Sequence, residues 1–186
     1  MVGKKGVEKM KNIILISGKA ESGKNLISSI LQKHLPNTLE TAFGDYVKFV
    51  CEKYIGWNGV KDNAGRQIIQ HWGTDVIRNE NYDFWALILS QLHFVLRNHY
   101  DYFITPDTRF LNEIDEQKIA FGNKVITIRV VRPNYISKLT EEQKNHISET
   151  ALDNYKNFDC IIVNDGTLED LEKKVEIFIE RYIKSD

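Results

Sequence analysis

The stretch NIILISGKAESGKNLISSI, residues 12–30, decides the fold. Its first part, Asn12–Ser17, is a short apolar run typical of a buried strand, and from Asn25 the apolar residues fall on one helical face. The residues between have the spacing glycine, four residues, glycine, lysine, which is the Walker A pattern. Such glycines let the backbone wrap around a phosphate, and the following helix N-terminus adds positive potential. We therefore predict a nucleotide-phosphate site at Gly18, Lys19, Ala20, Glu21, Ser22, Gly23, Lys24 and Asn25.

The last two residues of this loop have separate expected tasks. Lys24 can reach the terminal phosphates of a nucleotide and stabilise the charge that is transferred. The next position usually holds Ser or Thr, which ligates Mg²⁺, and here it holds Asn25. Because an amide oxygen can also coordinate a hard cation, we expect Asn25 at the metal, together with a carboxylate from elsewhere in the chain.

A second cluster follows the predicted strand Tyr102–Thr105, which Pro106 should end. A P-loop enzyme places a carboxylate near its metal just beyond a neighbouring strand, so Asp107 is the predicted second metal ligand. Arg109 beside it can hold a phosphate through two parallel hydrogen bonds. Arg132 lies where another strand gives way to a loop and could also reach phosphates. Structural pairings are expected instead for Arg78 and Arg129.

Short apolar segments alternate with amphipathic ones along the rest of the chain. Further strands are predicted at Thr38–Phe43, Lys124–Val131 and Asp159–Asn164. Helices are predicted from Asp45 toward Tyr54, after a cap at Asp83, and from Asp165–Thr167 with Asp170 placed for a capping box, while Gly56–Gly65 should be a loop. This alternation implies a parallel sheet wrapped by helices, with ligands at the carboxyl ends of the strands.

The composition fits one domain and excludes several classes of protein. The 186 residues are 42% hydrophobic and 27% charged, and the net charge of -1 argues against a general nucleic-acid binder. No apolar run approaches the roughly 18–20 residues that span a bilayer. Cys51 and Cys160 lack metal-type spacing and are expected as reduced core residues of a cytoplasmic protein. We expect a single domain over residues 1–186, with a flexible tail at residues 1–11.

Six segments of the chain together resemble a known family. They are GKAESGKN, GRQIIQHWGTDVIR, YDYFITPDTRFLNE, IRVVRP, HISETALD and DCIIVNDGTLEDL. In this order they resemble phage and phage-like bacterial deoxynucleoside monophosphate kinases, over nearly everything from Asn12 to the last helix. Animal phosphomevalonate kinases are similar too, especially in the phosphate loop and the SETALD–VND region. Members of both groups often carry Asp after the loop lysine, so Asn25 is a neutral variant of that pattern.

The resemblance implies a three-layer α/β P-loop NTPase fold of the nucleoside monophosphate kinase type, with a five-stranded parallel sheet flanked by helices. It implies transfer of the γ-phosphoryl group of ATP, with Mg²⁺, to a deoxynucleoside monophosphate. The acceptor would bind at about residues 44–80, and residues 132–150 would form a lid that includes Ser148. Catalytic roles are implied for Lys24, Arg66, Asp107, Arg109 and Arg132. Substrate binding is implied for Asp45, Lys48, Arg66, Gln70, Arg109, His146 and Glu149.

Trp85 is a further candidate for substrate binding, because its ring could stack on a base, although large aromatic side chains more often lie in the core. Two other functions stay open. A kinase of the same architecture could use another phosphorylated acceptor, such as a phosphomevalonate-like molecule, and a P-loop regulator would bind nucleotide without transferring phosphate. The second arginine cluster and the lid-like segment argue against the regulator. The expected partners are ATP and a small nucleotide acceptor, without a nucleic acid polymer or a membrane, and a homodimer is left open.

Overall fold

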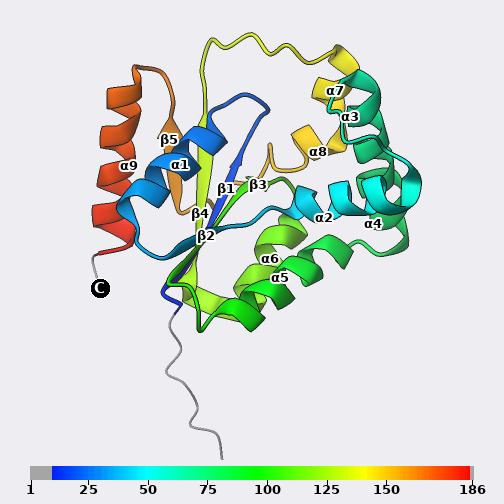
Figure 1. The fold of residues 1–186 in the computed structure, drawn as a ribbon. Helices are drawn as coiled ribbons and strands as arrows, with labels where there is room; N and C mark the ends of the chain where they lie inside the picture. Colours follow the sequence, from blue (N-terminus) through cyan, green and yellow to red (C-terminus); the bar gives the residue numbers. More distant parts are fainter. Residues whose placement is uncertain (1–9, 185–186) are drawn as a thin grey trace, which may run out of the picture.

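Five parallel strands form the centre of the molecule in the computed structural model, which describes residues 10–184 (Figure 1). Their order across the sheet is β2-β3-β1-β4-β5, so the strand that leads into the phosphate loop is central. The bounds are β1 Asn12–Gly18, β2 Thr38–Glu40, β3 Tyr102–Thr108, β4 Val125–Val131 and β5 Cys160–Val163. The predicted fold class, a five-stranded parallel sheet flanked by helices, is confirmed.

Helices cover both faces of the sheet because the buried strands are apolar on both sides. Ile14 and Ile16 of β1 pack in one core with the first and last helices, while Ile13 and Leu15 point to the opposite core. The two layers are visible in Figure 1. One layer is α1 Lys24–His34 and α9 Leu168–Tyr182, and the other is α5 Phe84–Leu96 and α6 Leu111–Phe121.

A group of short helices lies beside the sheet and forms its own core around Val47, Cys51, Trp57 and Trp85. The group consists of α2 Phe43–Val50, the π-helix η1 Cys51–Ile55, α3 Asn63–Gln70, the π-helix η2 His71–Val76 and α4 Ile77–Glu80. The remaining elements are the 3₁₀ turn η3 Gly122–Lys124, α7 Glu141–Asn145 and α8 Ile147–Thr150. The segment between β4 and α7 crosses from the sheet to this helical group (Figure 1).

The predicted loop at Gly56–Gly65 is shorter than expected, because α3 already begins at Asn63. The carboxylate of Asp62 accepts a hydrogen bond of 2.8 Å from the Gly65 N–H and caps this helix. Gly65 lies inside the first turn for a steric reason rather than as a helix breaker. A Cβ atom there would stand 2.0 Å from the carbonyl oxygen of Val60, so only glycine fits.

Strand β3 does not end at Pro106, as the sequence predicted, but continues to Thr108. In its pairing with β1, Leu15 faces Thr105 and Ser17 faces Thr108, so β3 has one extra residue between these pairs. Proline has no N–H to give to a ladder and is tolerated where a bulge interrupts the pairing. The bulge thus carries the chain through Pro106 to the edge where the predicted Asp107–Arg109 cluster lies.

The predicted N-terminal cap is present in α9 and absent in α5. Thr167 caps α9 and forms the predicted capping box with Asp170, whose carboxylate accepts from the Thr167 N–H at 3.0 Å. Asp83 precedes α5 as expected, but its side chain does not cap the helix. The Asp83 carboxylate accepts instead from the side-chain amide of Asn112 at 3.0 Å, which ties the start of α5 to α6.

The composition-based expectations have mixed outcomes. Cys51 and Cys160 are free, and among residues 10–184 no helix is long and apolar enough to cross a bilayer. The expected tail falls mostly outside the described residues. Its last two residues are fixed, however, since the Met10 N–H donates to the Arg97 carbonyl at 2.8 Å and Lys11 to that of Asp101 at 2.7 Å. The tail prediction was therefore wrong for Met10 and Lys11.

A buried ion pair joins the short helices to the start of α6. The guanidinium of Arg78 in α4 contacts the Glu113 carboxylate and stacks on the ring of Phe110, 3.9 Å from its centroid. The same carboxylate accepts from the N–H groups of Arg109 at 2.7 Å and Phe110 at 3.1 Å. Both charged side chains are under 10% exposed. The structural pairing expected for Arg78 is confirmed, and Glu113 fixes the backbone that carries Arg109.

We predict that Glu113→Gln lowers the free energy of unfolding by about 3 kcal/mol, because it leaves the buried Arg78 guanidinium without its counter-charge. Urea denaturation followed by circular dichroism measures this change. Asp115→Asn, an exposed change on the same helix, is the control and should cost at most about 0.5 kcal/mol. Equal stability of the two variants would show that the Arg78–Glu113 ion pair does not stabilise the contact between α4 and the start of α6.

Candidate functional site

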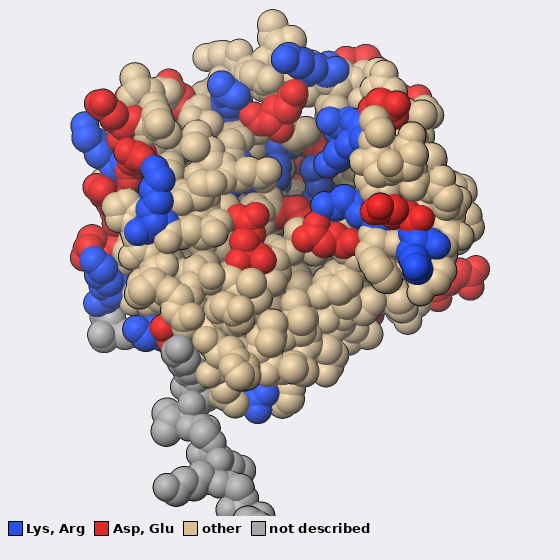
Figure 2. Space-filling model, in the orientation of Figure 1, with Lys and Arg blue, Asp and Glu red and all other residues tan. Residues whose placement is uncertain are grey.

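A cleft with a volume of ≈ 480 Å³ lies where β1 and β3 end, at the carboxyl ends of the strands. The phosphate loop forms one wall, and α2, α3 and η2 form the other. Figure 2 shows Lys and Arg side chains inside this recess, with Asp and Glu side chains along its rim. The residues of the sequence prediction that line it are Ala20, Glu21, Lys24, Asn25, Asp45, Lys48, Arg66, Gln70, Asp107, Arg109 and Glu149.

The phosphate loop owes its shape to close contact with the end of the sheet. Gly23 has a positive φ of 103°, which glycine adopts at little cost. A Cβ atom at this position would stand 2.5 Å from Nδ2 of Asn164, which itself donates to the Ser22 carbonyl at 3.0 Å. Glycine is therefore required where the loop turns into α1, as the Walker A spacing predicted.

The ammonium group of Lys24 is buried under the loop. Its Nζ donates to the carbonyl oxygens of Gly18 at 2.8 Å and Lys19 at 2.7 Å. Burial lowers the pKa of Lys24 to about 8, and the nearby charge of Arg109 adds to this effect, while Glu149 and Asp107 oppose it. A charge in this position is only partly compensated by the protein, which is the condition under which a phosphate binds well.

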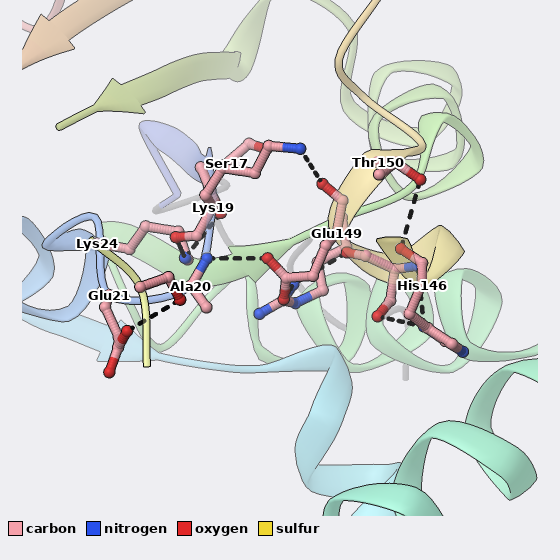
Figure 3. Close-up of polar contacts among 12 residues, drawn as sticks. Ser17, Lys19, Ala20, Glu21, Lys24, His146, Glu149 and Thr150 are labelled. Atoms are coloured by element: carbon pink, nitrogen blue, oxygen red, sulfur yellow. Dashed lines mark hydrogen bonds and ion pairs between the residues drawn. The ribbon is translucent and has the colours of Figure 1, made fainter. Parts of the chain in front are cut away.

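A carboxylate from α8 contacts the phosphate loop directly (Figure 3). Oε2 of Glu149 accepts the Ala20 N–H at 2.9 Å, and its Oε1 pairs with the guanidinium of Arg109. Arg109 also donates to the Ser148 carbonyl at 2.9 Å. Glu149 is 8% exposed. It therefore occupies two groups, a loop N–H and an arginine, that are suited to hold a phosphate oxygen.

Further contacts tie the loop to the segment at residues 132–150 and just beyond it. Nζ of Lys19 donates to the Glu149 carbonyl at 2.8 Å and lies 2.6 Å from the Asp153 carboxylate. The Glu21 carboxylate accepts from the Ser137 hydroxyl at 3.2 Å and the Lys138 N–H at 3.1 Å. Three consecutive loop residues thus contact the segment predicted as a lid or its continuation.

Arg132 lies at the outside of the loop and is absent from the cleft lining. Its guanidinium donates to the Glu21 carbonyl at 3.2 Å and lies 4.2 Å from the centre of the Tyr135 ring. In this arrangement Arg132 supports the loop from behind. Arg129 makes the structural pairing that was expected, with the Ser17 hydroxyl at 3.2 Å and Asp153 at 3.2 Å.

Asp107 has a structural task that the sequence did not reveal. Its two carboxylate oxygens accept from the N–H groups of Phe43 at 3.0 Å and Gly44 at 2.8 Å, at the start of α2. Burial raises the pKa of Asp107, whereas these two hydrogen bonds and the charge of Arg109 act in the opposite direction. This contact also explains why β2 stops at Glu40, short of the predicted Phe43, since the chain there turns into the helix that Asp107 caps.

Two of the predicted substrate-binding side chains do not line the cleft. Trp85 is fully buried, and its indole N–H donates to the Gly73 carbonyl at 2.9 Å, so its ring has no free face for a base and the stacking prediction was wrong. His146 points away from the phosphate loop (Figure 3). Its Nδ1 accepts from the Ser148 N–H at 3.2 Å and caps α8, and its Nε2 lies 3.8 Å from Asp75.

Two lining residues, Lys61 and Glu40, and one residue that contacts the phosphate loop, Asp153, were missed by the sequence analysis. Lys61 lies in the segment interpreted as a loop, and no motif pointed to it. Glu40 at the end of β2 accepts from Gln32 at 2.7 Å and also contacts the Ser28 hydroxyl. Asp153 ends the HISETALD segment, so its place in that motif was a signal that could have identified its contact with Lys19.

The class of protein follows from this geometry. A central strand that leads into a phosphate loop, with a cleft at the carboxyl ends of a parallel sheet, is the P-loop kinase architecture. Thymidylate kinase from Candida albicans gives a TM-score of 0.55 at 16% identity, over 92% of each chain. Dephospho-CoA kinase from Campylobacter jejuni gives 0.52 at 16% identity, over 95% of this chain and 100% of that one. At this identity the likeness shows the fold alone.

The chain belongs to the deoxynucleotide monophosphate kinase family, whose model matches residues 39–175. The deoxynucleotide monophosphate kinase of Enterobacteria phage T4 is 37% identical over 123 residues, which are 64% of this chain and 47% of the phage protein. The chain spans about half the length of this relative and of its counterpart in Escherichia phage RB69. A phosphomevalonate kinase of Drosophila melanogaster is 26% identical over 188 residues, which are 92% of this chain and 97% of that one. The resemblance read from the six motifs is confirmed.

We predict that Glu149→Gln tightens the binding of tripolyphosphate, measured by calorimetry without divalent cations. The change removes a negative charge that competes for Ala20 N–H and Arg109, and we expect a Kd lower by about five- to tenfold. Glu142→Gln, an exposed change on α7, serves as the control. Unchanged or weaker binding to the Glu149 variant would mean that its carboxylate does not compete with phosphate.

A second prediction concerns pH. The ammonium group of Lys24 is charged below its pKa of about 8 and loses its proton above it, so anion binding should weaken as the pH rises. Between about pH 7.5 and about pH 9, we expect the Kd for ATP to rise roughly tenfold. Lys24→Ala has no titrating group there and should bind weakly at both pH values. A flat profile in the unmodified protein would contradict the role of this charge.

Proposed function

We propose that this protein transfers the γ-phosphoryl group of ATP to a deoxynucleoside monophosphate and so forms the diphosphate. The observation that carries the proposal is the cleft itself. It has the phosphate loop with the buried Lys24 on one wall and a second group of cations, including Lys48 and Arg66, on the other. A donor and an acceptor that each carry phosphate fit such a double cationic site. Membership of the family supports the nucleotide as acceptor.

The residues have distinct roles in this proposal. Residues 18–25 hold the phosphates of ATP, and Lys24 neutralises the charge of the transferred group. Arg109 lies between the loop and the acceptor wall, where its contact with Glu149 can be exchanged for a phosphoryl oxygen. The acceptor binds in the region of residues 44–80, where Gln70, Lys48 and Arg66 line the cleft. Because two bound phosphates held in line react without a covalent intermediate, positioning and charge supply the catalysis.

Residues 132–150 serve as the lid in this proposal. The segment contacts the loop at two points: its Lys138 N–H donates to Glu21 of the loop, and its Glu149 carboxylate accepts from the Ala20 N–H. A phosphate bound at the loop would need the same N–H group that now holds Glu149. Closing the segment over both substrates would exclude water and prevent hydrolysis of ATP. Arg132 stands at the first residue of this segment and supports the loop through the Glu21 carbonyl rather than by touching the substrate.

The cleft residues fit a magnesium ion of the kinase type. Asn25 and Asp107 both line the cleft and offer an amide and a carboxylate oxygen. Among residues 10–184 no group of three or more His, Cys, Asp or Glu side chains could hold a metal alone. Mg²⁺ commonly keeps several waters and binds through one or two protein oxygens and substrate phosphates, which agrees with this small donor set. When bound, the ion neutralises charge on the donor phosphates.

A phosphomevalonate-like acceptor is the second candidate. The match to the Drosophila phosphomevalonate kinase covers nearly the whole length of both proteins, whereas the match to the phage T4 kinase covers about half of the phage protein. The charges of the cleft suit either acceptor, because both carry a phosphate. We favour the nucleotide because the family model covers residues 39–175, which include the whole acceptor wall.

A coupled assay of ADP release tests the proposal. With ATP and Mg²⁺, we expect turnover with at least one common deoxynucleoside monophosphate and little with phosphomevalonate. Lys24→Ala should lower kcat by about 10²–10³, because it removes a charge directed at the transferred group, while its circular dichroism spectrum stays unchanged.

The outcomes of this assay separate the candidates. Turnover with phosphomevalonate alone would establish the second candidate. Nucleotide binding without turnover for every acceptor would establish a P-loop regulator and refute the kinase. Near-normal kcat in the Lys24 variant would refute the mechanism even if the acceptor is right.

A further inference from the structure

Three ion pairs join charged side chains that line the cleft. Six carboxylates line it, and each has a partner among the described residues. Asp45 pairs with Lys48, Glu113 with Arg78, and Glu149 with Arg109. The other three accept hydrogen bonds from neutral groups or from main-chain N–H groups, and they are Glu21, Glu40 and Asp107. These three therefore form no ion pair with a cation of the cleft among the described residues.

Two lining cations are left over from this pairing. The cations of the cleft are Lys24, Lys48, Lys61, Arg66, Arg78 and Arg109. Lys24 donates to carbonyl oxygens, and three of the others are paired with the carboxylates above. Within residues 10–184, the side chains of Lys61 and Arg66 make neither a hydrogen bond nor an ion pair. Both flank the N-cap Asp62 of α3, on the wall opposite the phosphate loop.

The surroundings of Lys61 are positively charged. The residue as a whole is exposed, yet partial burial of its ammonium group is the largest cause that lowers its pKa. The charges of Arg66, Lys48 and Arg109 lower it further, and Asp107 gives the opposing effect. Three cations of the cleft lining thus lie close enough to Lys61 to disfavour its charged form. Such an arrangement is unfavourable until an anion joins it.

We infer that Lys61 and Arg66 form the subsite for the phosphate that the acceptor already carries, with Lys61 as its specificity-determining residue. This inference rests on the proposed function and adds a residue that no motif assigned. A monophosphate near neutral pH carries up to two negative charges. Arg66 can hold two of its oxygens side by side, while Lys61 adds a point charge to the same group.

The subsite explains how the cleft tells a nucleotide from an unphosphorylated nucleoside. A nucleoside leaves Lys61 and Arg66 unpaired, so the repulsion that Arg66, Lys48 and Arg109 exert on Lys61 persists. A phosphate removes this repulsion and makes charge-assisted hydrogen bonds. Selection for a phosphorylated acceptor then comes from a pair of cations on α3 and its preceding turn, independently of the base.

The test compares Lys61→Gln with Lys61→Arg and with a matched control, Lys53→Gln, which is exposed on η1 and absent from the cleft lining. We expect Lys61→Gln to raise the KM for the acceptor monophosphate by about tenfold or more, with the KM for ATP within about twofold. Lys61→Arg should retain most of the affinity, and Lys53→Gln should behave like the unmodified protein.

A second measurement separates phosphate recognition from a general effect on the pocket. Calorimetry with the deoxynucleoside and with its monophosphate gives the affinity gained from the phosphate. Lys61→Gln should reduce this gain about tenfold and leave nucleoside binding unchanged. Equal losses for both ligands, or no loss for the monophosphate, would overturn the subsite while leaving the kinase proposal intact. If the unmodified protein neither binds nor phosphorylates any phosphorylated acceptor, both proposals fail together.

Discussion

The buried ammonium group of Lys24 is the charge on which the cleft depends. The strand β1 and the helix α1 meet at a glycine-rich turn, and the turn leaves this group under the loop, where its hydrogen-bond partners among the described residues are two carbonyl oxygens. Burial disfavours the charged form, which is why the pKa of Lys24 falls to about 8. A bound phosphate would supply a negative charge beside this group, so burial that disfavours the charge in the free protein would favour a bound anion.

In the free protein, the Glu149 carboxylate supplies negative charge beside Lys24 and Arg109. Glu149 reaches the loop from a segment far away in the sequence and accepts from Ala20 while it pairs with Arg109. The contact lowers the energy of the empty cleft, yet it also competes with any phosphate that arrives. In the proposed function, a donor phosphate and the Glu149 carboxylate would therefore compete for the same two groups, the Ala20 N–H and the Arg109 guanidinium.

The parts of this arrangement that depend on local sequence could be predicted, and those that depend on distant contacts could not. The phosphate loop, the parallel sheet and the capping box of α9 follow from short patterns in the chain. The continuation of β3 through Pro106 depends on a bulge against β1. The capping of α2 by Asp107 connects this residue to Phe43 and Gly44, which precede it in the sequence by 64 and 63 positions. No local pattern marks Lys61, because its place in the lining of the cleft depends on how the segment before α3 folds against the sheet.

The choice between acceptors must lie in the uncharged part of the cleft. Both candidate acceptors carry a phosphate, so Arg66, Lys61 and the loop cannot distinguish them. The remaining lining of α3 and η2 is neutral, and Gln70 and Thr74 offer its side-chain hydrogen bonds. Trp85 lies behind this wall and holds Gly73 through its carbonyl, so it shapes the pocket without touching the ligand. Because a site that hydrogen-bonds a polar edge rejects ligands lacking that edge, a base would be selected here, at a distance from the chemistry.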